Sequence, residues 1–562
     1  MRRGWGRGGA LALALTLALG ACAASSARPL RLSQENWTEV RGQALPTCRE
    51  AWAQVPPAQR TYDFTRDAHV TEQGNIGYQG FAERLPRQRC AKEWTVLIYM
   101  EADNQDLPPL AYWQLHEMEA FSRAGQSGAS TLDADVVVQL DLDRPSGIRR
   151  LHVFGVAASS EPRPGPAAFK DATPRDIRSP IVELLPEDND VAAPEEELAQ
   201  FLRWGVTSYP ARHYWVVVWG HGMGWRPRMT ASGQPVPPDQ NITNGGIGLD
   251  DHPGTVLDVT GLREALAAVS REDLGGRPFD VLATDACLMQ SVEVLAELGG
   301  VARYAIGSEQ IENYLGLPYR LLLPRINGSA GAGPPPQEGC MQSDVACRFA
   351  TLVPAEMARS LRPGGPYAEI APDAREPLTE SVLDLNETGR LLVPALRQLS
   401  AALSLWTAEE PLRKITLQDV LLPPQGPGAL GGLRRTPDFQ GGMRDLGVLL
   451  DRLERTVEQE SGTPSGATAT TAGTGAGQKV LTAIAAVRSA LGQTVLMAAF
   501  GTRYQTEEYV GMAGVSIWVP ITGDDYQSRG DFFAASPLYA APPAARKGIE
   551  QPWRMWLDTL YQ

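Results

Sequence analysis

From residue 94 onward, short runs of apolar, largely β-branched residues alternate with longer stretches of helical periodicity. Runs that are apolar on both faces are typical of strands in the middle of a sheet that is covered by helices. These runs occupy residues 94–100, 135–140, 214–219, 279–283 and 301–306. Their alternation with helical stretches predicts an α/β fold with a mostly parallel central sheet.

The pattern changes beyond this α/β domain, for which we predict the bounds 93–324. Residues 325–374 are rich in Pro and Gly and are expected to form a loop-rich connector. Leucine and valine then recur at helical spacing, so residues 375–562 are predicted to form a helical C-terminal region. A late apolar run at residues 514–519 is interpreted as a strand that returns to the main sheet.

The N-terminus carries the features of an export signal. Arg2, Arg3 and Arg7 precede an apolar run that is too short to span a bilayer, and this run leads into Leu-Gly-Ala-Cys, which ends at Cys22. The last four residues resemble the cleavage box of bacterial lipoproteins, so residues 1–21 are predicted to be removed and Cys22 to carry lipid. The alternative is a plain signal peptide with a chance cysteine.

Lipidation would attach the exported chain to a membrane, at the outer membrane or the cell surface, through its lipid alone. No other segment reaches the ~18 consecutive apolar residues that a spanning helix needs. Residues 22–92 are expected to form an irregular arm. Lys and Arg total 51 against 65 Asp and Glu, and no basic stripe is present, so nucleic acid is not an expected partner. We expect a monomer.

Export also places the chain in an oxidising compartment, in which cysteines tend to pair. If the lipidated cysteine is set aside, five of the 6 cysteines remain. Cys340 and Cys347 enclose a short loop and are predicted to pair, and Cys48 is predicted to pair with Cys90. Cys287 is then left single. An unpaired thiol in an exported protein is a candidate reactive group, and the alternative is a buried, inert cysteine.

Two candidate catalytic residues follow neighbouring strands of the predicted sheet. His221 comes after the third apolar run and Cys287 after the fourth. Functional groups collect beyond the carboxyl ends of parallel strands, so these side chains are expected to meet. A thiol protease uses such a pair: the thiolate attacks an amide carbonyl, the imidazole protonates the leaving amine, and backbone N–H groups bind the oxyanion. The Gly222 and Cys287 amides are the oxyanion-hole candidates. Taken singly, each side chain also has a purely structural interpretation.

The segments around these residues resemble the clostripain family of cysteine peptidases, within the clan of caspases, gingipains and legumains. The matching motifs lie at residues 96–104, 219–225, 248–251, 285–289 and 307–309. Weaker likeness extends the resemblance over about residues 93–562. The fold that it implies is a caspase-like αβα sandwich with an added helical C-terminal region.

The resemblance also implies roles for single residues. His221 and Cys287 match the catalytic dyad, and Asp285 lies by the pocket for a basic P1 side chain. Gln290 stands where the family commonly has a small residue. Some members are activated by cleavage between the two catalytic residues, for which Arg228 is the candidate here; alternatively, Arg226 and Arg228 are only surface residues of a polar loop.

Some members of the family also need calcium. Asp141 and Asp143 are acidic neighbours, but a solvated strand end explains them equally well, and the sequence contains no EF-hand loop. We therefore predict no cofactor and assign no metal ligand, with calcium as the alternative that the resemblance implies.

The function implied is a lipid-anchored endopeptidase that cuts protein or peptide substrates after Arg in preference to Lys, because a carboxylate at Asp285 binds a guanidinium through two hydrogen bonds. Alternatively, Asp285 only orients the Cys287 turn by accepting backbone N–H bonds. A second possible function is a catalytically inactive surface lipoprotein that uses the fold as a binding module, although the retention of His221 and Cys287 favours the enzyme. A metal hydrolase is excluded, because the 6 histidines include no H-x₃-H pair.

Overall fold

The computed structural model describes residues 91–561, apart from 122–128, 132, 144–146, 155–156, 159–163, 180, 186–192, 226–245, 252–253, 327–338, 423–435, 440–441, 462–474 and 528–551. The predictions for the signal peptide, Cys22, the N-terminal arm with Cys48 and Cys90, and Arg228 all lie outside the described residues.

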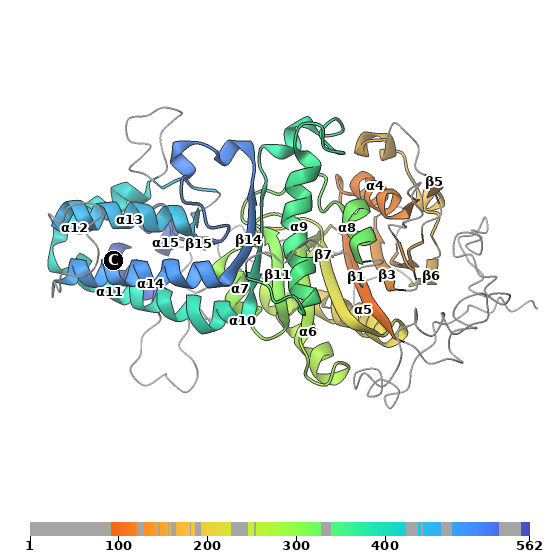
Figure 1. The fold of residues 1–562 in the computed structure, drawn as a ribbon, viewed down its shortest axis with the longest axis horizontal. Coiled ribbons are helices and arrows are strands. Elements are labelled where there is room, and N and C mark those ends of the chain that lie inside the picture. The colour runs from red at the N-terminus through yellow and green to blue at the C-terminus, as the bar shows by residue number, and fades with distance from the viewer. Residues whose placement is uncertain are drawn as a thin grey trace, which may run out of the picture.

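A nine-stranded sheet forms the centre of the fold (Figure 1). Its strands follow the order β14 (Val495–Phe500), β12 (Thr379–Asp384), β11 (Ala302–Ser308), β10 (Phe279–Asp285), β7 (Ala211–Trp219), β1 (Lys92–Ala102), β3 (Ala134–Leu142), β4 (Arg149–His152) and β6 (Ile181–Leu184). The strands from β11 to β3 are parallel to one another, and the flanking strands on both sides are antiparallel. The predicted α/β class with a mostly parallel central sheet is confirmed.

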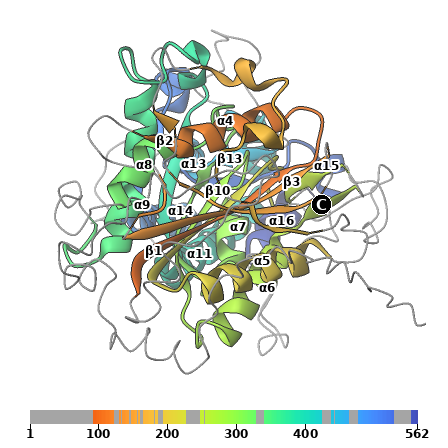
Figure 2. The same ribbon diagram turned by 90° about the vertical axis from the view of Figure 1, so that its right-hand side faces the viewer.

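Helices cover both faces of this sheet, as Figure 2 shows. One face carries α5 (Pro194–Ser208) and α6 (Val259–Glu272), and the other carries α4 (Pro108–Glu119), α8 (Tyr319–Ile326) and α9 (Val345–Leu361). The central strands are therefore buried on both faces, and every residue of β3 and β10 is buried. This double burial explains why their sequences are continuous apolar runs rather than alternating ones.

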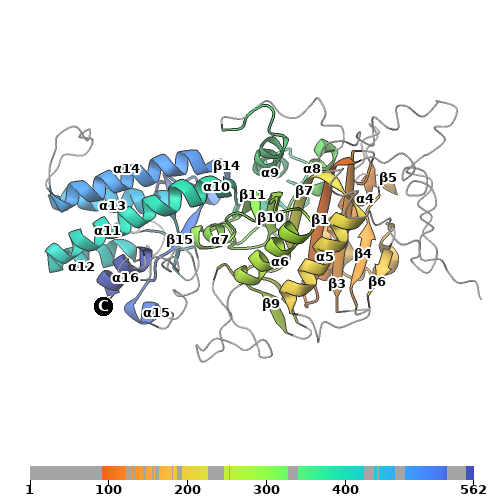
Figure 3. The same cartoon turned by 90° about the horizontal axis from the view of Figure 1, so that it is seen from below.

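The C-terminal helices pack beside the β14 edge of the sheet (Figures 1 and 3). They are α11 (Val393–Glu409), α12 (Pro411–Leu421), α13 (Leu446–Ser461), α14 (Ala476–Thr494) and α16 (Pro552–Tyr561), with the short α10 (Leu385–Glu387) and α15 (Gly523–Gln527) beside them. Their leucine and valine stripes are buried and join the apolar core of the α5/α6 face. Among the described residues, no helix is both long enough and apolar enough to cross a membrane.

The strand predicted at residues 514–519 exists, but its predicted partner was wrong. β15 (Ser516–Trp518) pairs antiparallel with β13 (Met443–Asp445) in a separate two-stranded sheet. The strand that returns to the main sheet is β14, which begins at the residue after α14 ends. Because the apolar stripe of α14 runs directly into this strand, the periodicity gives no boundary between the two elements.

Two further short pairings are formed by the remaining described strands. β2 (Ala120–Phe121) pairs with β5 (Ala157–Ala158), and β8 (Ile247–Asp250) pairs with β9 (Thr255–Leu257). Residues 220–224 run along β8, through backbone hydrogen bonds from Gly248 N to His221 O at 2.8 Å and from Met223 N to Gly246 O at 2.9 Å. The pairing with β8 therefore shapes the segment that carries the candidate catalytic histidine.

The predicted disulfide between Cys340 and Cys347 is confirmed, with 5.7 Å between the two Cα atoms. It ties the segment before α9 to the first turn of that helix, where Asp344 caps the backbone N–H of Cys347. Cys287 is a free thiol. The prediction that Cys287 is unpaired is confirmed.

Candidate active site

The two candidate catalytic residues lie at the same edge of the sheet. β7 and β10 are neighbouring parallel strands, and their last paired residues are Trp219 and Asp285. His221 and Cys287 each follow two residues later, and the N–H of Gly220 donates to the carbonyl of Asp285 across the gap at 3.3 Å. The carboxyl ends of the two strands thus bring the histidine segment and the cysteine segment together, as parallel strands predict.

Gly222 makes the closest contact between these segments. A Cβ atom at this position would lie 2.2 Å from the carbonyl oxygen of Cys287 and 2.8 Å from its nitrogen, so only glycine fits. Gly222 forms an antiparallel bridge with Ile247, but the hydrogen bonds of this bridge are made by the residues on either side of it. Its own N–H is thus not used in that pairing and points away from β8. Both amides predicted for the oxyanion hole therefore belong to residues in contact.

The Cys287 thiol is partly buried, and burial raises its pKa. The backbone N–H of Glu312 donates to Cys287 Sγ at 3.3 Å, which favours the thiolate and opposes that effect. The turn continues through Leu288, whose φ of 63° is left-handed. Such a backbone costs a leucine about 1–2 kcal/mol, so the surrounding contacts must hold it.

His221 is oriented by a residue that the sequence analysis did not identify. Its Nε2 lies 3.0 Å from Oδ1 of Asp106, which sits between β1 and α4. A proton on Nε2 would be held by this carboxylate, leaving Nδ1 for acid–base work. Because the Asp106 side chain is 69 % exposed, its contribution to stability is small. The sequence feature that points to Asp106 is its position beyond the carboxyl end of β1, the strand next to β7.

Asp285 is buried, and its carboxylate accepts hydrogen bonds from the loop that follows β11. Leu317 N–H lies 3.1 Å from Oδ1, and the Tyr319 hydroxyl lies 2.6 Å from Oδ2. Gly316 is packed against it, since a Cβ there would lie 2.7 Å from Oδ1. Asp285 therefore anchors the loop that delivers the Glu312 N–H to Cys287. The structural role predicted for Asp285 was to bind the Cys287 turn itself. Its hydrogen-bond partners are instead Leu317 and Tyr319.

Two further carboxyl groups face Asp285, and we call Asp285, Glu312 and Glu380 the carboxyl trio. Glu312 shares a hydrogen bond with Asp285. Glu380, on β12, is 1 % exposed, and neither of its carboxyl oxygens has a hydrogen-bond partner. Burial raises the pKa of Asp285 to about 6, and burial with mutual repulsion raises the pKa of Glu312 and Glu380 well above the usual range. The sequence feature that points to Glu380 is the presence of a glutamate inside the buried strand β12.

A second group of carboxylates lies beneath the histidine segment. Burial raises the pKa of Glu101 well above its usual range, and Asp141, Asp250 and Glu197 add to this by repulsion. Glu101 packs closely against Gly220 and Gly248, since an added Cβ atom would lie 3.2 Å from its carbonyl oxygen at Gly220 and 3.4 Å from its Cβ at Gly248. Within the described part of the chain, no group of three or more His, Cys, Asp or Glu side chains is arranged to hold a metal ion.

A family model described as "Peptidase_C11: Clostripain family" matches residues 98–392, which is more than half of the chain. The chain belongs to the clostripain family. The match begins within β1, includes β7 and β10 with His221 and Cys287, and ends directly before α11.

Solved structures of clostripain-family (C11) proteases also resemble the chain. One is a secreted C11 cysteine protease from Bacteroides thetaiotaomicron in complex with an irreversible peptide inhibitor, with 18 % identity, a TM-score of 0.45, and coverage of 79 % of this chain and 97 % of that one. Another is an inactive zymogen C11 protease from Parabacteroides distasonis, with 18 % identity, a TM-score of 0.47, and coverage of 80 % and 97 %. A comparison with the curated proteins found no match.

Proposed function

We propose that this clostripain-family chain is an active cysteine endopeptidase in which Cys287 is the nucleophile and His221 the general acid–base. The observation that carries the proposal is the contact of Gly222 with the backbone of Cys287 across the ends of β7 and β10. This contact places Gly222, the residue after His221, against the backbone of the residue that carries the free thiol. The arrangement is the one that acyl transfer requires, with nucleophile, base and oxyanion donors at one edge.

The chemistry follows from these positions. The Cys287 thiolate attacks the scissile carbonyl carbon, and the Gly222 and Cys287 N–H groups are proposed to bind the oxygen as it becomes negative. The imidazolium of His221 then gives its proton to the leaving amine, and a thioester remains. Water, deprotonated by His221, hydrolyses the thioester and restores the thiol. Asp106 stabilises the imidazolium by accepting from Nε2.

We further propose that the carboxyl trio selects a basic P1 side chain. In the described part of the chain, the charged groups that shift the pKa of Glu312 and Glu380 are all negative. An arginine or lysine from the substrate would supply the cation that these buried carboxyl groups favour. A guanidinium can bind a carboxylate through two parallel hydrogen bonds, whereas an ammonium binds at a single point, so arginine should be preferred. Asp285 keeps its hydrogen bonds to the loop in this arrangement, so its structural and selective roles are compatible.

The test is hydrolysis of three fluorogenic peptides that differ only at P1, with Arg, Lys or norleucine. We expect kcat/KM to fall in that order, with the norleucine peptide at least about a hundredfold below the arginine peptide, because an unpaired buried charge remains in its complex. Equal rates on all three would contradict the basic specificity. No hydrolysis of any peptide by folded, reduced protein would favour the non-catalytic binding module.

We also propose that the enzyme is an exported lipoprotein held to the membrane through Cys22. The support is the box Leu19-Gly20-Ala21-Cys22 behind a basic and apolar leader. The Cys22→Ala protein is expected to leave the membrane fraction and to lose all label from a palmitate analogue. Cys48→Ala, a second cysteine from the same N-terminal part, serves as control and should keep the label. Equal labelling of wild type and Cys22→Ala would refute lipidation at this residue.

A further inference from the structure

The segment between β10 and α7 (Val292–Glu297), which carries Cys287, is held by strands from outside the central parallel sheet. Gln290 is the centre of these contacts. Its side chain is 1 % exposed, and its Nε2 donates to Ser381 on β12, at 3.1 Å to the backbone oxygen and 3.0 Å to Oγ. A small residue, which is common at this position in the family, could make neither of these bonds.

The backbone of Gln290 is tied on both sides as well. Its N–H donates to Ser308 O at the end of β11 at 3.0 Å, and its carbonyl accepts from Ser516 N on β15 at 3.0 Å. Ser381 continues the chain of contacts, because its hydroxyl donates to the carbonyl of Gly514 just before β15. One residue thus connects the nucleophile segment to β11, β12 and β15.

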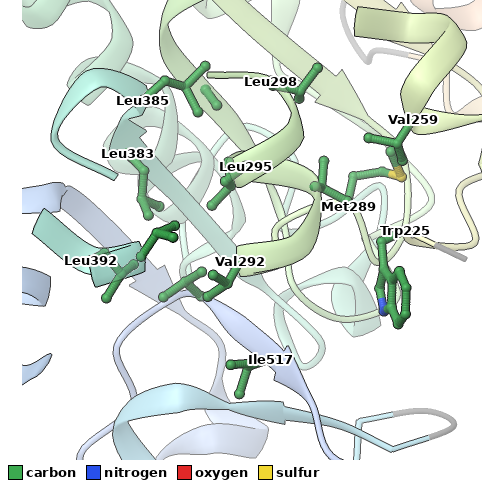
Figure 4. Close-up of a cluster of buried hydrophobic side chains, with 14 of the residues drawn as sticks. Trp225, Val259, Met289, Val292, Leu295, Leu298, Leu383, Leu385, Leu392 and Ile517 are labelled. Atoms are coloured by element: carbon green, nitrogen blue, oxygen red, sulfur yellow. The ribbon is translucent and has the colours of Figure 1, made fainter. Parts of the chain in front are cut away.

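Apolar side chains also pack between the nucleophile segment, β12 and β15 (Figure 4). Met289 and Val292, which flank Gln290, lie in one buried cluster with Leu383 from β12 and Ile517 from β15. β15 lies far beyond residue 392, where the match to the family model ends. The C-terminal region therefore forms part of the support of the nucleophile in this chain.

The nucleophile segment needs such support because of its backbone. Leu288, immediately after Cys287, is left-handed, and a strained backbone persists only where its surroundings fix it. Leu288 N donates to Gln310 O at 3.1 Å, and Glu312 N donates to Cys287 Sγ. Fixing Gln290 to the end of β11 keeps residues 287–290 beside residues 308–312, so that these two bonds can form.

We infer that Gln290 is a positioning residue of this enzyme: its side chain fixes the Cys287 turn to Ser381 on β12 and, through the Ser381 hydroxyl, to Gly514 just before β15. In this way it adds to the backbone bonds of residue 290 and makes the C-terminal region part of the catalytic apparatus. Gln290 touches no reacting atom. It acts through the positions of two groups of Cys287. The Sγ atom must meet the scissile carbonyl carbon, and the N–H must meet the oxyanion, each within a fraction of an ångström. This inference rests on the proposed function of Cys287 as nucleophile.

The test is Gln290→Met, which keeps the volume of the side chain and removes both hydrogen bonds to Ser381. We expect kcat per titrated active site to fall about 10- to 100-fold with KM changed less than about threefold, since a misplaced nucleophile affects the chemical step rather than substrate binding. The rate of Cys287 alkylation by iodoacetamide should change, because the Glu312 N–H bond to Sγ depends on the turn. Gln418→Met is the matched control: Gln418 also donates to a backbone carbonyl, that of Leu560, but lies among the C-terminal helices.

Ser381→Ala keeps the inference testable if Gln290→Met does not fold. It removes one acceptor of the Gln290 amide and should lower kcat in the same direction by about three- to tenfold. A kcat per site and an alkylation rate equal to wild type in Gln290→Met, or losses matched by Gln418→Met, would overturn the inference. If wild type hydrolyses no peptide, the proposed function fails, while the alkylation rates still decide whether Gln290 positions Cys287.

Discussion

Cys287→Ala is expected to lose peptidase activity by at least about three orders of magnitude while remaining folded. Only the thiolate can form the acyl bond, and removal of a nucleophile leaves the small catalysis that oxyanion binding alone supplies. His221→Ala should fall by a similar factor, because the leaving amine then has no proton donor. The measurement is kcat/KM on a P1-arginine peptide, with the melting temperature recorded for each variant.

His213→Ala is the matched control for the histidine variant. His213 lies on the same strand, β7, but its Nδ1 is 3.1 Å from Asp280 and its ring packs on Trp94 near the start of the strand. Its loss should leave kcat/KM within about threefold of wild type. Activity retained in Cys287→Ala, or lost equally in His213→Ala and His221→Ala, would contradict the assignment of the dyad.

Asp285→Asn is expected to reduce cleavage after arginine by about a hundredfold or more, and cleavage after norleucine far less. The basis is the loss of one buried charged partner, which typically costs about 3–5 kcal/mol. The same substitution should speed alkylation of Cys287 near neutral pH, because burial raises the pKa of this thiol and the charge of Asp285 adds to that rise. Slower cleavage after arginine together with faster alkylation would show that a charge has been lost. A fall in both rates would show that the site has collapsed.

Glu380→Gln distinguishes selection from loop anchoring. Neither carboxyl oxygen of Glu380 accepts a hydrogen bond, so the change removes a carboxyl of the trio without breaking a contact. We expect the Arg-over-norleucine ratio to fall about tenfold with no loss of stability. If both substrates decline by one common factor in Asp285→Asn and neither declines in Glu380→Gln, Asp285 is purely structural and the specificity lies elsewhere.

The pH dependence follows from the same carboxyl. Burial raises the folded pKa of Asp285 to about 6, so the group is neutral below this pH and negative above it. A negative group attracts a P1 cation, so the ratio of kcat/KM for the arginine peptide to that for the norleucine peptide should rise as the pH increases through about 6. In Asp285→Asn this rise should be absent, because asparagine does not titrate.

Several features of the fold and of the candidate site could be predicted from the sequence because they depend on local patterns. The buried strands are continuous apolar runs, and the order of strands and helices placed His221 and Cys287 at one edge. The Cys340–Cys347 pair is separated by only 7 residues, so its closure is local. These features need no knowledge of how distant segments pack.

Other parts depend on contacts between residues far apart in the chain. Glu380 meets Asp285 only because β12 turns antiparallel beside β11. β14 was missed because it continues the stripe of α14 without a break, and β15 pairs with β13 rather than with the main sheet. Asp106 reaches His221 from the loop after a different strand, and no spacing in the sequence connects the two.

Covalent labelling of the native protein shows whether Cys287 is the nucleophile of an enzyme that is selective for basic residues. The reagent is a short peptide chloromethyl ketone with arginine at the reacting end, and its norleucine counterpart is the comparison. Mass mapping of the native protein should place one equivalent of the arginine reagent on Cys287 as a thioether, at least about a hundredfold faster than the norleucine reagent and not at all in Cys287→Ala. Equal labelling by both reagents would rule out the selectivity for basic residues, and labelling of Cys287 only after the protein is unfolded would rule out its role as nucleophile.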